Sequence, residues 1–261
     1  MSEPEVHVLR RPDHHVVTID REAQRNALGD GVARGIMRAL DDAEADPGCR
    51  VVVLTGRGDR AFCAGGDLKT KAGDSPFDVD ASEPRNFVVT LLRRMEQCRL
   101  PIIARVNGHA VAGGLGLLCA CDLAITTDRA KFGTPEVGIG VFPMMILPHM
   151  QRILPPRRLL ELCLTGDLFD ANQALAMGLV NTVVPAEQLD ASVDALVAKL
   201  VTRSPAAIKL GKMGLAAMRD MVLDQALEYA QLMIATMTRT EDAAEGLDAF
   251  RAKRPPVWSG T

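Results

Sequence analysis

Aromatic side chains are scarce in this sequence of 261 residues, which holds one tryptophan, one tyrosine and seven phenylalanines. Proteins that bind single-stranded nucleic acid commonly stack bases on aromatic side chains, so the composition argues against that function. Lysine and arginine number 30 against 33 aspartates and glutamates, and no basic run occurs. The net charge of −3 therefore indicates no nucleic-acid partner.

Long apolar runs are also missing. The longest, residues 110–121, is interrupted by glycines and is shorter than the roughly 20 residues of a membrane-spanning helix. The N-terminal MSEPEVHVLRR segment lacks the apolar stretch of a secretory signal. We therefore expect a cytoplasmic protein that has no membrane partner.

The six cysteines form no C-x-x-C pair, which excludes the usual spacing of metal and redox motifs. We expect no metal site and a structural role for every thiol as a small buried apolar group. Cys63 borders a glycine-rich segment, but no histidine is placed in sequence to activate it as a nucleophile. The cysteines are Cys49, Cys63, Cys98, Cys119, Cys121 and Cys163.

Apolar patterning predicts alternating strands and helices up to about residue 143 and mostly helices beyond it. A recurring order of strand, glycine turn and helix favours a layered α/β core. A polar segment over residues 73–84 is predicted to be a loop. Strands are expected at 6–10, 15–20, 51–55, 102–106, 122–127 and 179–184, and helices at 26–45, 87–98 and 113–121.

Two glycine-rich segments follow buried strands, namely AFCAGGDLK over residues 61–69 and NGHAVAGGLG over residues 107–116. Glycine allows backbone N–H groups to approach a ligand closely. Two such loops can place two N–H donors around one oxygen atom, which is the construction of an oxyanion hole. We predict that Ala64 and Gly113 supply these donors.

Glu136 follows Pro135 within an apolar stretch that includes Phe132 and Val137. Apolar surroundings raise the pKa of a carboxyl group, which suits it to exchange protons near neutral pH. Glu136 is therefore the predicted acid–base residue.

These motifs, together with RNAL at residues 25–28, FGTPE at 132–136 and the terminal FRAKRPPVW at 250–258, resemble the enoyl-CoA hydratase/isomerase (crotonase) superfamily in their order along the chain. The resemblance implies an α/β fold of the crotonase-like (ClpP/crotonase) type, a spiral of stacked strand–strand–helix repeats. It implies a core over residues 1–200 and a helical trimerisation segment over residues 201–261. Homotrimers, or hexamers made of two trimers, are expected.

The resemblance also implies an acyl-CoA thioester substrate, with coenzyme A carried by the substrate and no separate cofactor. Glu136, Ala64 and Gly113 are the implied catalytic residues. The implied substrate-binding residues are Gln24, Arg25, Ala64, Gly65, Gly66, Asp67, Leu68, Gly113, Gly114, Pro135, Gly140, Phe142, Phe250 and Lys253.

One position departs from the family pattern. Well-known hydratases of this family carry a second glutamate three residues after the oxyanion-hole glycine, where this chain has Gly116. The first acidic residue beyond is Asp122. Hydration of a 2-enoyl-CoA is the leading hypothesis, and double-bond isomerisation is the alternative enzyme activity. A non-catalytic acyl-CoA-binding or assembly protein is the alternative of another class.

Overall fold

A computed structural model describes residues 4–67 and 85–261 of the chain. Leu68 and the predicted loop over residues 73–84 lie outside the described residues. Within the described ranges, no helix is long and apolar enough to cross a membrane.

The main sheet has six strands in the order β1-β2-β3-β5-β7-β10. β1 and β2 pair antiparallel, and each later pair is parallel. All six residues of β3 are buried, as expected for an apolar run at the centre of a sheet that is covered on both faces. The strands are β1 (Val6–Arg10), β2 (His14–Ile19), β3 (Val51–Gly56), β5 (Ile102–Val106), β7 (Leu123–Thr127) and β10 (Thr182–Val184).

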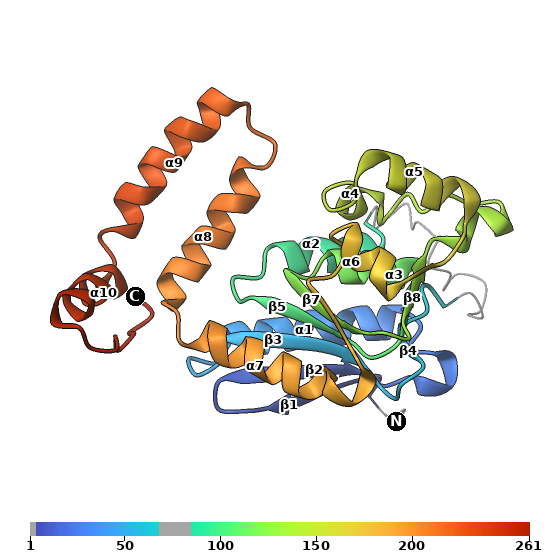
Figure 1. Ribbon diagram of the computed structural model, residues 1–261, viewed down its shortest axis with the longest axis horizontal. Coiled ribbons are helices and arrows are strands. Elements are labelled where there is room, and N and C mark those ends of the chain that lie inside the picture. Colours follow the sequence, from blue (N-terminus) through green and yellow to red (C-terminus); the bar gives the residue numbers. More distant parts are fainter. Residues whose placement is uncertain (1–3, 68–84) are drawn as a thin grey trace.

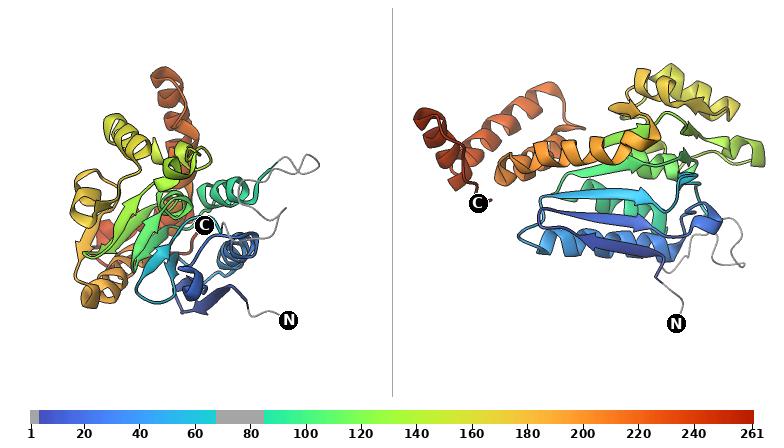
Figure 2. Two further views of the ribbon diagram at one scale, coloured as in Figure 1. Left: turned by 90° about the vertical axis from the view of Figure 1, so that its right-hand side faces the viewer. Right: turned by 60° about the horizontal axis from the view of Figure 1, so that its bottom comes forward.

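A second sheet of four short strands has the order β4-β6-β8-β9. β4, β6 and β8 pair in parallel, and β9 is antiparallel to β8. Each of the first three follows a strand of the main sheet along the chain, so the order strand, strand, helix recurs in three successive turns. The strands are β4 (Ala61–Cys63), β6 (His109–Val111), β8 (Lys131–Gly133) and β9 (Phe169–Asp170). This stacking confirms the predicted spiral (Figure 2).

The helices cover both faces of the main sheet (Figure 1). Val51 and Val53 pack with Val193 of α7 on one face, whereas Val52 and Leu54 join the larger cluster that includes α1 and α2. The helices are α1 (Asp30–Ala45), α2 (Phe87–Glu96), α3 (Gly113–Cys119), α4 (Leu147–Met150), α5 (Pro156–Thr165), α6 (Ala171–Ala176), α7 (Leu189–Val201), α8 (Pro205–Met218), α9 (Leu223–Met237) and α10 (Glu241–Ala252). The 3₁₀ helices of the described ranges are η1 (Glu22–Gln24), η2 (Pro135–Ile139) and η3 (Ala186–Gln188).

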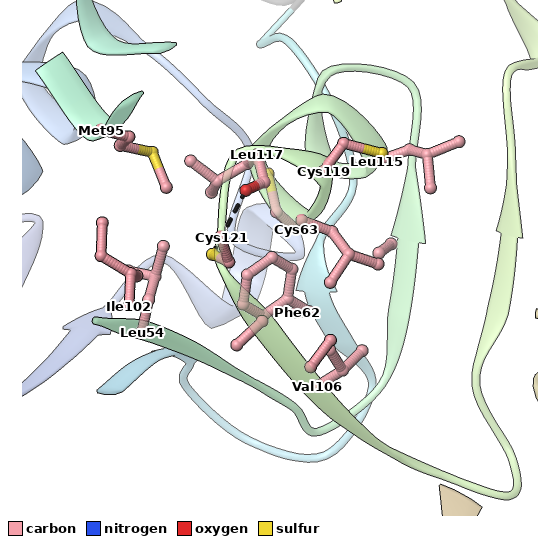
Figure 3. Packing of buried hydrophobic residues seen from close by; sticks show 14 of the residues in the cluster. Leu54, Phe62, Cys63, Met95, Ile102, Val106, Leu115, Leu117, Cys119 and Cys121 are labelled. Carbon is pink, nitrogen blue, oxygen red and sulfur yellow. Dashed lines mark hydrogen bonds between the residues drawn. The ribbon is translucent and has the colours of Figure 1, made fainter. Parts of the chain in front are cut away.

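The larger apolar cluster contains the buried thiols (Figure 3). Cys63, Cys119 and Cys121 lie among apolar side chains such as Phe62 and Leu117, and the Cys121 thiol donates to the Leu117 carbonyl at 3.4 Å. Burial raises the pKa of Cys63 to about 11 and that of Cys119 to about 12. All six cysteines are buried and free, which agrees with a structural role and disfavours a nucleophilic Cys63.

Helices α8, α9 and α10 extend away from the sheets (Figure 1). The side chain of Asp242, at the start of α10, accepts hydrogen bonds from Ser204 Oγ and from the Ser259 and Gly260 N–H groups. These bonds fasten the C-terminal residues to the beginning of α8. No side chain of helix α9 is buried, and the trimerisation role of this segment stays a prediction.

The predicted helix over residues 26–45 is wrong at its beginning, because α1 starts at Asp30. Arg25 and Asn26 have φ values of 53° and 56°, in the left-handed region that a right-handed helix excludes. The Asn26 side-chain amide donates to the carbonyls of Ala61 at 2.7 Å and Arg57 at 3.0 Å. This turn ties the segment before α1 to β4.

Candidate active site

A cavity of about 630 Å³ opens where the short strands β4, β6 and β8 end. The carboxyl ends of parallel strands meet on one side of a sheet, so the segments that follow them converge there. The described lining residues are Leu28, Ala64, Gly66, Val88, Ala112, Gly113, Pro135, Glu136, Ile139, Val141, Phe142, Pro143, Met144, Met145 and Ile146. The lining is therefore apolar apart from backbone groups and one carboxyl.

Ala64 does not fit its predicted role as an N–H donor. Its N–H donates to the Arg25 carbonyl at 3.1 Å, so the group is already engaged. Gly66 is better placed: Leu28 pairs with the carbonyl of Gly65 and the N–H of Asp67, which leaves the Gly66 N–H on the other side of the strand. Within residues 4–67 and 85–261, the Gly66 and Gly113 N–H groups donate to no protein acceptor.

Gly66 and Gly113 face the same space. A Cβ atom added to Gly113 would lie 3.4 Å from the Gly66 nitrogen, and both residues line the cavity. Gly113 is the first residue of α3, where backbone N–H groups have no partner within the helix. The two amide N–H groups can therefore both donate a hydrogen bond to one oxygen atom placed between them.

Gly65 and Gly114 do not line the cavity; their lack of a side chain allows the two glycine-rich loops to pack closely. Gly65 has a φ of 95°, and a Cβ there would lie 2.6 Å from the Ala112 Cβ. A Cβ on Gly114 would collide with the backbone of Cys63 in β4. Ala112 itself adopts a φ of 51°, a strained conformation for a residue with a side chain. The tight packing of these loops fixes the direction of the Gly66 and Gly113 amides.

Glu136 lies on η2, directly after β8. Burial raises the pKa of its carboxyl group, and its buried Oε2 atom has no hydrogen-bond partner among the described residues. An unpartnered buried carboxyl oxygen is costly and is typical of a group held for chemistry. Pro135 and Phe142 line the cavity beside Glu136, whereas Gly140 closes η2 in the left-handed conformation.

The backbone of η2 is fastened to α5 by a residue that the sequence analysis missed. The Thr134 hydroxyl is fully buried and donates to the Leu162 carbonyl at 3.2 Å. Gly166, with a φ of 71°, ends α5, and a Cβ there would lie 3.5 Å from the Pro135 Cα. No local sequence signal marks Thr134, because its partner lies 28 residues away.

The position of the family's second glutamate holds no polar group. Gly116 is buried on α3, and a Cβ added there would lie 2.5 Å from the Ile146 Cβ. The Asp122 carboxylate instead accepts from the Ile102 N–H at 2.7 Å and pairs with Lys212. Glu136 is therefore the one ionisable side chain among the described residues of the lining.

A smaller, basic cavity of about 260 Å³ is lined by Arg25, Asp59, Arg60, Gly108, His109 and Arg129. The pKa of His109 is lowered by burial and by the positive charges of Arg25 and Lys131, so the pocket favours an anion over another cation. Arg25 connects the two cavities, because its carbonyl accepts the Ala64 N–H while its side chain lines the basic one.

Other predicted binding residues lie outside both cavities. Gln24 is exposed on η1, and Asp67 forms an ion pair with Arg21 at 2.7 Å. Phe250 is 83% exposed on α10 and is followed by exposed Lys253. Figure 1 places α10 at the opposite end of the molecule from α3, so Phe250 on α10 and Lys253 directly after it lie far from the cavity of the same chain.

The family model for enoyl-CoA hydratase/isomerase matches residues 15–261 of this chain. This chain belongs to the enoyl-CoA hydratase/isomerase family. A Thermus thermophilus protein named "Putative enoyl-CoA hydratase" is 38% identical over 244 residues, which cover 92% of this chain and 95% of that protein. The (E)-benzylidenesuccinyl-CoA hydratase of Thauera aromatica is 32% identical over 248 residues, which cover 94% of this chain and 94% of that protein.

Solved structures of the family have the same fold. The enoyl-CoA hydratase of Mycobacterium tuberculosis H37Rv superposes with a TM-score of 0.88 at 33% identity, covering 99% of this chain and all of that one. The family model and the fold confirm the resemblance drawn from the motifs. Membership in the family makes this chain an enzyme of the hydratase/isomerase type.

Proposed function

We propose that this enzyme adds water to the double bond of a 2-enoyl-CoA thioester. The observation that carries the proposal is one cavity that holds two unpaired amide donors, Gly66 and Gly113, together with a buried carboxyl of raised pKa, Glu136. The two amide donors suit a thioester oxygen that becomes negative, and the carboxyl group suits proton transfer near neutral pH. The hydratases among the relatives support this assignment.

In the proposed reaction, the thioester oxygen lies between the Gly66 and Gly113 N–H groups. The Glu136 carboxylate takes a proton from water as the oxygen of that water bonds to Cβ, and the π electrons move onto the thioester oxygen. Glu136 then returns a proton to Cα, and the electrons on oxygen restore the C=O bond. Each amide donor contributes roughly 2.7–4 kcal/mol to stabilisation of the transition state.

The charged end of coenzyme A is proposed to occupy the basic cavity. Arg25, Arg60 and Arg129 line it, and guanidinium groups bind phosphate oxygens through pairs of charge-assisted hydrogen bonds. Gln24, Gly65, Gly66 and Asp67 remain proposed contacts of the coenzyme A moiety. No cofactor beyond the coenzyme A of the substrate is proposed.

A second copy of this chain is proposed to complete the site. Phe250 and Lys253 are exposed and distant from their own cavity, so they are available to a neighbouring subunit. A homotrimer, or a hexamer of two trimers, would bring them near another subunit's basic cavity. Six free thiols are the state that a reducing compartment maintains, and we propose a cytosolic location.

Isomerisation of a 3-enoyl-CoA is the second candidate, because the apolar contact at Gly116 leaves a single described carboxyl. One base suffices to remove a proton from Cα and return it at Cγ. Absorbance assays of the purified enzyme with crotonyl-CoA and, separately, with 3-hexenoyl-CoA distinguish the two reactions. Hydration lowers the absorbance of the conjugated enoyl thioester, isomerisation raises it, and failure to bind either thioester would refute both.

A further inference from the structure

The contact between α3 and the segment before α4 fixes one wall of the large cavity. The Ile146 side chain lines the cavity and is 3% exposed. It also fills the space into which any side chain at Gly116 would project, since a Cβ there would lie 2.5 Å from the Ile146 Cβ and 3.5 Å from its Cα.

Ile146 cannot easily leave this position. Its Cβ is branched and bonded to the backbone, so moving the Cβ requires moving the main chain. The Ile146 N–H donates to the Pro143 carbonyl at 3.2 Å, and its own carbonyl accepts the Met150 N–H at 3.1 Å. On the other side, the Gly116 carbonyl accepts the Ala120 N–H at 3.0 Å. Hydrogen-bonded turns therefore hold both partners of the contact.

We propose that Ile146 is a specificity-determining residue that makes the enzyme select a bulky apolar acyl group, branched or aryl, over a short straight chain. The inference rests on the proposed function, since it concerns the acyl group of the same thioester. Ile146 places apolar surface where a polar residue at position 116 would otherwise stand. With Phe142 and Met145 it belongs to a cavity of about 630 Å³.

The lining explains the selection. A crotonyl group ends in one methyl and leaves much of this apolar surface in contact with water, whereas a phenyl or branched group covers it. A polar acyl group would lose its hydrogen bonds to water, because the side chains described in the lining offer it no partner except Glu136. Size and apolarity are therefore selected together.

Binding of two saturated thioesters, 3-phenylpropanoyl-CoA and butanoyl-CoA, tests the proposal without the chemical step. Calorimetry is expected to give a Kd at least tenfold lower for the phenyl compound with the natural enzyme. Ile146→Thr keeps the branched shape but adds a hydroxyl, and should reduce the ratio below threefold. Ile146→Val should keep the ratio, and so should the control Ile153→Thr, which alters a half-buried isoleucine that follows α4 and lies outside the described lining.

A swap across the contact provides an independent measurement. Gly116→Ala alone should lower the melting temperature, and adding Ile146→Ala should not restore it, because the Ile146 Cβ remains 2.5 Å away. Combining Gly116→Ala with Ile146→Gly leaves the Cα at 3.5 Å as the nearest of these atoms, so this pair should melt at a higher temperature than the pair with Ile146→Ala while also losing the preference for the phenyl thioester.

The outcomes separate the two levels of inference. If neither thioester binds the natural enzyme, the proposed function fails. If both bind with similar Kd values, or if Ile146→Thr leaves a large ratio unchanged, acyl-CoA binding stands and the role of Ile146 is overturned.

Discussion

The Glu136 carboxyl is the ionisable side chain in the described lining of the large cavity, and its chemistry depends on being partly removed from water. Burial raises its pKa, and its Oε2 atom has no partner in the part of the protein that the structure describes. A carboxyl group in this state exchanges protons more readily near neutral pH than a solvated one. The apolar neighbours that create this property also make the residue costly for folding.

Glu136→Gln is expected to lower kcat by roughly 10²–10⁴-fold and to change the Kd of a saturated acyl-CoA little, since glutamine keeps the shape. Steady-state kinetics and calorimetry measure the two effects. The matched control is Glu161→Gln, which alters an exposed glutamate paired with Arg158 and should leave kcat unchanged. More than half of the natural rate in Glu136→Gln would exclude Glu136 as the proton carrier.

The same substitution should change the pH dependence of stability. Because the pKa of Glu136 is raised in the folded state, the folded chain binds more protons than the unfolded chain between the two pKa values, and stability falls as pH rises through that interval. Glu136→Gln removes this loss. Its melting temperature should exceed that of the natural protein at pH 8 and match it at pH 4, and an equal difference at both pH values would contradict the assignment.

At this scale the role of Glu136 stays a prediction from the sequence, whereas the Ala64 N–H, predicted as an amide donor, is already engaged with the Arg25 carbonyl. The raised pKa of Glu136 could be predicted because the residues around it are apolar. The choice between Ala64 and Gly66 could not, since it depends on the hydrogen bond from the Ala64 N–H to the Arg25 carbonyl. That bond follows from the left-handed turn at Arg25 and Asn26, where the pattern of apolar residues predicted helix.

At the scale of elements, the long strands and helices of the core were predictable and the short strands were not. β3 and β5 are continuous apolar runs, and their sequence identifies them. β4, β6 and β8 have three residues each, too few for a periodic pattern, and they exist through pairing with one another. The cavity lies at the ends of these three strands. The residues that line it could therefore be expected to come together from the family motifs, but not from the pattern of apolar residues.

Alanine substitutions at two glycines, one in a glycine-rich loop and one in α8, are expected to change the stability of the protein in opposite directions. Gly65→Ala should destabilise the protein by at least 1 kcal/mol, because it combines a φ of 95° with a contact of 2.6 Å to the Ala112 Cβ. Gly211→Ala, inside α8 with no atom within 4 Å of the new Cβ, should stabilise it by up to about 1 kcal/mol. Chemical unfolding measures both, and equal effects would refute the packing argument.

The fastening of η2 to α5 can be tested at Thr134. Thr134→Val keeps the volume but removes the hydroxyl that donates to the Leu162 carbonyl, and should cost about 1 kcal/mol of stability. Since η2 carries Glu136, kcat should fall while the Kd of a saturated thioester changes little. Thr134→Ser retains the hydroxyl and should recover kcat; loss of kcat in both variants would indicate a packing role alone.

At the scale of the whole molecule, two features remain unused by a single chain. The C-terminal helices expose large apolar side chains. Phe250 and Lys253 lie on and directly after α10, which Figure 1 places at the opposite end of the molecule from α3. The exposed side chains on α8 and α9 and between them are Met213, Leu215, Val222, Leu223, Leu227, Leu232 and Ile234. An apolar surface of this kind marks an interaction site, and the proposed trimer would cover it.

The double substitution Leu227→Glu with Ile234→Glu is expected to separate the subunits, because burying two carboxylates in an apolar interface is costly. Both side chains are more than half exposed in the single chain, so the fold should survive. Light scattering should report a monomer where the natural protein gives a trimer or hexamer, and circular dichroism should stay unchanged.

The monomer should also show a raised KM for the acyl-CoA, because Phe250 and Lys253 of a neighbour would no longer reach the bound coenzyme. Lys253→Ala in the intact oligomer provides the comparison: it should raise KM without changing the mass. Leu9→Glu, at an exposed position on β1, is the control for added charge and should change neither value. A monomer with an unaltered KM would show that each subunit binds its substrate alone, and would contradict the shared site.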